Sequence, residues 1–129
     1  MKIWFLRLLR VVVAIPGLLF ITMGLRWLVD PAGIAPDLGL SLEAGLGLSS
    51  QVGDLSAFFL VAGLCVFSAL VTGNRTWYYP PAMLLLTAAT GRLVAWIVHG
   101  AAFAIQMIVF EIIVALLLLL ASRFLTKEQ

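Results

Sequence analysis

Two charged residues, Arg92 and Glu111, lie well inside apolar runs that are long enough to cross a lipid bilayer. A charge at the centre of a transmembrane helix costs roughly 2.5 to 3.5 kcal/mol on insertion scales, so it usually faces a partner or a wet cavity rather than lipid. The two runs meet near Ala101, and an antiparallel hairpin there would bring both side chains to the same depth. Their types and spacing therefore predict an intramembrane ion pair, a ligand-binding site, or both.

Trp96 and His99 follow Arg92 at i+4 and i+7, which places all three on one face of a helix. At this spacing Trp96 could stabilise Arg92 through a cation–π contact, and both Trp96 and His99 could line a pocket. The alternative is that Trp96 is a packing residue and that His99 is a terminal residue in contact with water.

Three further polar residues are predicted at the same side of the membrane. Arg26 lies near the end of the first apolar run, Asp54 near the start of the second, and Gln106 between Ala101 and Glu111. They are candidates to gather with Arg92 and Glu111 in an outward-facing polar half of the bundle. The simpler interpretation is that Arg26 extends its charge to the interface and that Asp54 caps a helix.

Composition fixes the class of protein that must position these residues. The chain has 129 residues, of which 64% are hydrophobic and 11% charged, whereas soluble domains carry about 25% charged residues. At about 20 apolar residues per crossing, this length allows four spans and no separate soluble domain. The sequence predicts an all-α, four-helix transmembrane bundle of up-down topology, in a single domain covering residues 1–129.

Turn residues place the boundaries of these spans at about residues 8–29, 55–72, 80–99 and 103–124. The first span ends at Asp30-Pro31, the second ends at Gly73-Asn74, and the third opens at Pro80-Pro81. Residues 30–53 are then left as one long outer loop, which is either a lid over the bundle or an interfacial loop whose leucines dip into the headgroups.

Basic residues determine the orientation. Apart from Arg26, the lysines and arginines at the ends of the spans all fall on the side of the two chain ends and of the connection between the second and third spans: Lys2, Arg7, Arg10, Arg75, Arg123 and Lys127. The loops of the other side carry none. By the positive-inside rule this side is cytoplasmic, so both termini are predicted in the cytoplasm. This distribution explains the positive net charge without nucleic acid as a partner.

Small residues recur at four-residue spacing on the third span, at Thr87, Gly91 and Ala95. Such a small-xxx-small stripe is typical of closely packed transmembrane helices. We therefore expect this face to pack tightly, while the neighbouring face presents Arg92 to the bundle interior.

Several kinds of chemistry find no support in the sequence. A single histidine excludes an internal bis-histidine haem, and the lone Cys65 excludes an internal disulfide and a CxxC motif. No set of His, Cys and carboxylates has metal-ligand spacing, and the chain has neither a phosphate-binding loop nor a nucleophile elbow. We predict neither a metal nor a cofactor.

The order Asp30-Pro31, Gly91-Arg92-Leu93, His99-Gly100 and Glu111 resembles a family of small four-helix bacterial membrane proteins, catalogued as a domain of unknown function. The resemblance covers roughly residues 24–120. The chain departs from it at His99, where an aspartate is more usual, and at Asp54-Leu55-Ser56, where the family tends to a Glu-Leu-Arg-like step. The resemblance implies a four-helix bundle in the bacterial inner membrane and implies no activity.

The leading hypothesis for function is a non-enzymatic module that binds a lipophilic small molecule or lipid in an outer-half pocket. Arg92 and Glu111 would be its polar anchors, with Trp96 and His99 as pocket wall. The second hypothesis is an accessory subunit of a larger membrane complex, with a membrane-protein partner or a second copy of the chain. A proton-coupled carrier ranks third, because Arg92 would hold Glu111 ionised. An enzyme that uses Glu111 and His99 as acid and base is less favoured.

Overall fold

The computed structural model describes residues 1–127, and this part of the chain is helical with no strand. Its long helices are α1 (Lys2–Val29), α3 (Gly45–Thr72), α4 (Tyr79–His99) and α5 (Ile105–Phe124). All four are long and apolar enough to cross a membrane. The predicted all-α transmembrane bundle is confirmed, and the chain is a multi-pass membrane protein.

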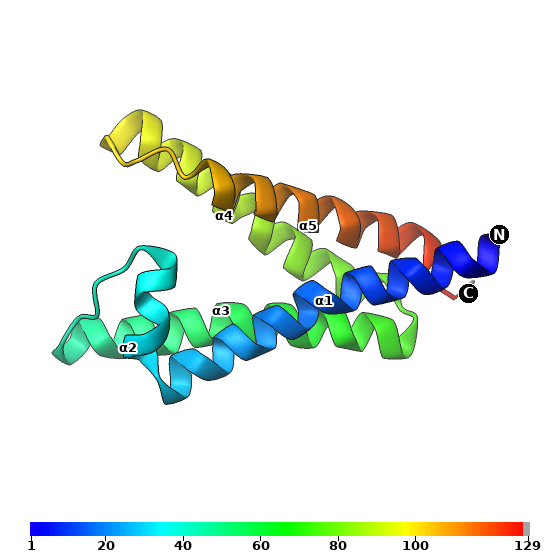
Figure 1. The fold of residues 1–129 in the computed structure, drawn as a ribbon, viewed down its shortest axis with the longest axis horizontal. Helices are drawn as coiled ribbons and strands as arrows, with labels where there is room; N and C mark the ends of the chain where they lie inside the picture. Colours follow the sequence, from blue (N-terminus) through cyan, green and yellow to red (C-terminus); the bar gives the residue numbers. More distant parts are fainter. Residues whose placement is uncertain (128–129) are drawn as a thin grey trace.

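The long helices form two antiparallel hairpins, α1 with α3 and α4 with α5 (Figure 1). The hairpins lie together at the end that carries both termini and diverge toward the opposite end, which we call the terminal end and the loop end. At the terminal end Phe5 of α1 meets Phe124 of α5 edge to face, with ring centroids 5.7 Å apart. Val13 and Leu118 are fully buried in the core. The bundle is therefore a wedge that opens at the loop end.

Glycines let the backbones of α1 and α3 approach closely. A Cβ added at Gly63 would stand 2.8 Å from the carbonyl oxygen of Gly17, and one added at Gly24 would stand 2.9 Å from the amide nitrogen of Leu60. In lipid, where tails are as apolar as the helices, such close packing is a main source of helix association. These glycines make the first hairpin a tightly packed unit.

The predicted tight packing of the small-residue stripe on α4 was wrong. Thr87 and Gly91 are exposed, and a Cβ added at Gly91 would meet no atom within 4 Å. The spacing of small residues marks a face that can be approached closely, but it does not say which helix has such a partner. In this structure the close helix packing is between α1 and α3.

The predicted outer loop of residues 30–53 is shorter and more ordered than expected. Residues 31–38 form α2 (Pro31–Ile34) and the 3-10 turn η1 (Ala35–Leu38). Ile34 and Ala35 are buried in the core together with Trp27 of α1. The segment therefore packs onto the loop end of the first hairpin.

Asp54 does not cap a helix, because α3 begins at Gly45 and carries Asp54 as an exposed residue inside it. Extending an existing helix is much easier than nucleating one, so the glycines and serines after Gly45 do not stop it. Gln51 also ties this extension to the preceding chain. Its Oε1 accepts from the amide of Glu43 (2.8 Å) and its Nε2 donates to the carbonyl of Ser41 (2.9 Å).

The close approach of α1 and α3 predicts opposite effects for one substitution at two glycines. Gly63→Ala should lower the free energy of unfolding by about 1–3 kcal/mol, because the added methyl meets the backbone of α1. Gly91→Ala should leave the protein equally stable or raise its stability by up to about 1 kcal/mol, because the site is open and alanine favours helix. Unfolding in mixed micelles with increasing SDS measures both, and equal losses at both sites would contradict the packing described here.

Candidate functional site

Arg92 and Glu111 meet because of the turn between α4 and α5. Gly100 ends α4 with a left-handed backbone (φ 69°), a conformation that glycine adopts without strain. Arg92 lies seven residues before the end of α4 and Glu111 six residues after the start of α5. At 1.5 Å per residue, both therefore stand about 10 Å from the loop end of their helices.

The two side chains form an ion pair in which the Arg92 Nε donates to the Glu111 Oε1 at 2.5 Å. The Glu111 side chain is only 7% exposed, whereas the Arg92 side chain is 36% exposed. The carboxylate is thus held behind the guanidinium, and a molecule that approaches the pair meets Arg92 first.

The pair borders a cavity of about 290 Å³ between the two hairpins, which we call the Arg92 cavity. Its polar lining is Asp37, Arg92, Gln106 and Glu111. Its apolar lining is Met23, Leu38, Phe58, Phe59, Leu85, Met107 and Phe110. Every long helix and the connection after α1 contribute to this lining, so the cavity exists only in the assembled wedge.

Aromatic side chains lie where the hairpins come together beside the cavity. Phe20 of α1 is almost fully buried and contacts Phe59 of α3 and Phe110 of α5, with ring centroids 6.1 and 6.2 Å apart. Phe58 meets Phe59 edge to face at 5.0 Å. Aromatic rings from α3 and α5 therefore form part of the cavity wall, while its charged groups come from η1, α4 and α5.

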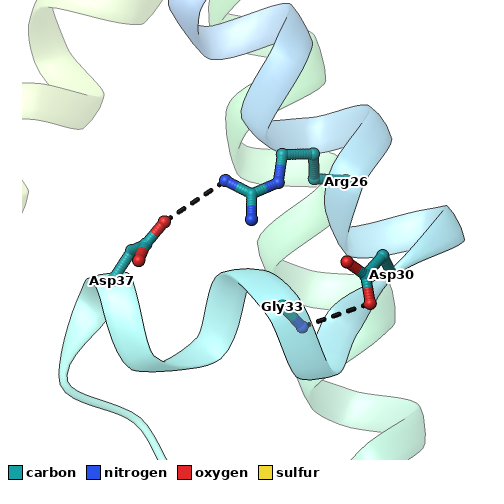
Figure 2. Close-up of polar contacts among 4 residues, drawn as sticks. All are labelled: Arg26, Asp30, Gly33 and Asp37. Atoms are coloured by element: carbon teal, nitrogen blue, oxygen red, sulfur yellow. Dashed lines mark hydrogen bonds and ion pairs between the residues drawn. The ribbon is translucent and has the colours of Figure 1, made fainter.

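A second ion pair holds the connection after α1 (Figure 2). The Arg26 Nη1 donates to the Asp37 Oδ2 at 3.2 Å, and the amide of Gly33 donates to the Asp30 Oδ1 at 3.2 Å, which caps α2. Both side chains of the ion pair are substantially exposed, 42% for Arg26 and 61% for Asp37. This pair ties η1 to α1 at the edge of the Arg92 cavity, which Asp37 lines.

The structure gathers only some of the predicted polar residues. Arg92, Glu111 and Gln106 line the Arg92 cavity, and Arg26 reaches it through its partner Asp37. His99 is exposed at the end of α4, and Asp54 is exposed on α3.

Trp96 stacks on Phe103, with ring centroids 4.5 Å apart and ring planes inclined by 32°. Within residues 1–127 the cation–π contact is that of Arg7 over Trp4, and Arg92 makes none. Of the two roles considered for Trp96, the structure therefore shows packing, against Phe103, and not the cation–π contact with Arg92. Neither Trp96 nor His99 is among the residues that line the Arg92 cavity, where both were expected as its wall.

Sequence reasoning missed Asp37 and the aromatic wall. Phe110 could have been found, since it immediately precedes Glu111 and must lie near the same depth. Asp37 and Arg26 lie 11 residues apart across two short helical turns, and no sequence periodicity links them. In the part of the chain that is described, no group of three His, Cys, Asp or Glu residues could hold a metal ion.

No protein-family model, no curated protein and no solved structure matches this chain. The chemistry of the Arg92 cavity is therefore what distinguishes between functions.

A double-mutant cycle should show that the buried pair is coupled. Arg92→Ala should destabilise the protein more than Arg92→Ala/Glu111→Ala, because the single variant leaves a buried carboxylate without a partner. We expect a coupling energy of about 1–2 kcal/mol from SDS unfolding.

Arg26 and Asp37 provide the matched control, because the same two kinds of charge meet there in an exposed position. Their cycle should give a coupling energy of about 0.5 kcal/mol or less. A coupling energy between Arg92 and Glu111 that is no larger than the coupling energy of the control pair would contradict the assignment of a buried pair.

Proposed function

We propose that this protein is a binding module for a lipophilic small molecule or lipid, and that the Arg92 cavity binds the polar head of this ligand. The observation that carries the proposal is an ion pair with a buried carboxylate and a partly exposed guanidinium, at the side of a cavity whose remaining lining, apart from Asp37 and Gln106, is apolar and aromatic. Ligand sites have this composition, with mostly hydrophobic walls and a few polar groups that fix orientation.

Size also supports a partly enclosed ligand. Small-molecule sites measure about 300–1,000 Å³, and the Arg92 cavity, at about 290 Å³, lies just below that range. It accommodates a head group and the first part of an apolar body, with the remainder outside the cavity. A purely structural pair explains the arrangement less well, because buried ion pairs often add little stability.

We further propose that the loop end faces outward and the terminal end faces the cytoplasm of a bacterial cell, in its inner membrane. The basic residues at both chain ends and at Arg75 support this orientation. The resemblance carried by Gly91-Arg92-Leu93 and Glu111 supports the bacterial location. The Arg92 cavity would then open in the outer half of the membrane.

A second candidate function is that of an accessory subunit in a larger membrane complex. The small-residue face of α4 favours it, because Thr87 and Gly91 are exposed and could be covered closely by a helix of another chain. A proton-coupled carrier is disfavoured, because Glu111 is already engaged by Arg92.

Native mass spectrometry of the protein extracted gently from its own membrane tests the proposal. The wild-type protein should retain a discrete small mass that is lost in Arg92→Ala. Arg92→Gln/Glu111→Gln should also lose it while keeping a neutral, hydrogen-bonding pair in the same space, which guards against a folding defect. Arg75→Ala, which removes an exposed arginine at the terminal end, should retain the mass.

Two results would contradict ligand binding. A wild-type protein without any retained mass, or an Arg92→Ala variant that retains it fully, would reduce the pair to a structural role. A second polypeptide in place of a small mass would favour the accessory-subunit function.

A further inference from the structure

The Arg92 cavity does not end at Arg92. A second cavity of about 290 Å³ shares Leu38, Phe58, Phe59 and Arg92 with it and adds Ala88 among its other lining residues. A third hollow, an apolar groove of about 670 Å³, shares Phe58 and Ala88 with the second. The three hollows adjoin one another and lead from the charge pair, past Phe58 and Ala88, to the surface between α3 and α4.

The groove follows the axis of α4 and therefore runs across the membrane. Its residues on α4 run from Ala88 back to Met83, Leu84 and Pro80, toward the terminal end. The distance along α4 from Arg92 to Pro80 is about 18 Å at 1.5 Å per residue. Because Arg92 stands about 10 Å from the loop end of α4, the groove runs from there past the bilayer centre and covers most of the remaining thickness of a hydrocarbon core about 30 Å thick. A molecule anchored at Arg92 would therefore lie in the groove along α4, with its apolar chain directed toward the terminal end.

The guanidinium indicates the chemistry of the head group. Its Nε is engaged by Glu111, and among residues 1–127 its terminal nitrogens Nη1 and Nη2 have no hydrogen-bond partner. These two nitrogens are suited to a bidentate interaction with a carboxylate or a phosphate. A cationic head is disfavoured, because Glu111 is buried behind Arg92 and Asp37 is paired with Arg26.

We propose that the three hollows form one site for an amphiphile with an acidic head, whose carboxylate or phosphate binds Arg92 and whose long apolar chain leaves the bundle between α3 and α4 beside Ala88. The inference rests on the proposed function and adds the charge of the head and the path of the chain. Carboxylate and phosphate heads share the chemistry that Arg92 recognises, so a fatty acid and a phospholipid are its two sources.

Binding of radiolabelled probes to the purified full-length protein in nanodiscs of neutral lipid tests the charge of the head. Palmitate or hexadecyl phosphate should bind, and methyl palmitate and hexadecyltrimethylammonium should bind at least tenfold more weakly. Preference for palmitate points to a fatty acid as the source, and preference for hexadecyl phosphate to a phospholipid. Equal binding of the neutral or the cationic probe would overturn the acidic head, and so would inorganic phosphate that binds as tightly as the chain-bearing probes.

Variants in the groove test the path of the chain. Ala88→Phe should weaken the preferred long-chain probe at least tenfold and its eight-carbon counterpart as well, because Ala88 lies only about 6 Å along α4 from Arg92 and borders the same cavity. Ala57→Phe is the matched control, because Ala57 is exposed on α3 and lines none of the three hollows, and it should change neither affinity. Met83→Trp lies at an exposed position about 14 Å along α4 from Arg92, so it should weaken the long-chain probe at least tenfold, leave the eight-carbon probe within twofold and not disturb the core.

The outcomes separate the two proposals. Tight binding of the long-chain probe that is lost in Arg92→Ala but unchanged in both Ala88→Phe and Met83→Trp would overturn the chain path and leave the binding function intact. Failure of every amphiphile to bind the wild-type protein would remove the proposed function itself. A palmitate analogue with a diazirine near the chain end gives a positional readout, and it should label the segment of α4 that contains Met83 and Leu84.

Discussion

The arrangement at the loop end depends on keeping two opposite charges inside an apolar bundle. Neither Arg92 nor Glu111 is well tolerated alone among transmembrane helices, so the α4–α5 hairpin must hold them at one depth. The turn at Gly100 achieves this with one left-handed residue. The pair is neutral as a whole but asymmetric, because the carboxylate is buried and the guanidinium borders the cavity. A bundle that only needed a cross-link between helices has no need of this asymmetry.

The two hairpins have different internal packing, and this difference shapes the cavity. The backbones of α1 and α3 approach at Gly17 and Gly63, whereas Gly91 of α4 touches no other element. The two hairpins meet at the contact of Phe20 with Phe110 and at the packing of Phe5 on Phe124. Contacts concentrated toward one end of a wedge leave the other end free to hold a polar site without filling it.

Much of the fold followed from the sequence, because hydrophobic length and turn residues act locally. The ends of α1, α3 and α4 lie at Val29, Thr72 and His99, where proline or glycine punctuates the chain. The contact of Arg92 with Glu111 could be anticipated because the cost of an isolated charge leaves few alternatives. Three other features could not be predicted: the start of α3, the pairing of Arg26 with Asp37, and the glycine contact of α1 with α3. Each depends on which segments meet in space, and no local pattern of Gly45, Asp37 or Gly63 specifies its partner.

The order of the two hairpins along the chain has a consequence for biogenesis. The long helices pack chiefly in consecutive pairs, α1 with α3 and α4 with α5, so the first hairpin can assemble before the second has left the ribosome. The third candidate span, Arg75–His99, is the least apolar of the four and carries Arg92, while the counter-ion of Arg92 is encoded 19 residues later. Until Glu111 emerges, this span enters the bilayer with an unneutralised arginine. The second hairpin is therefore best inserted as one unit, with α5 acting as the partner that retains α4 in the membrane.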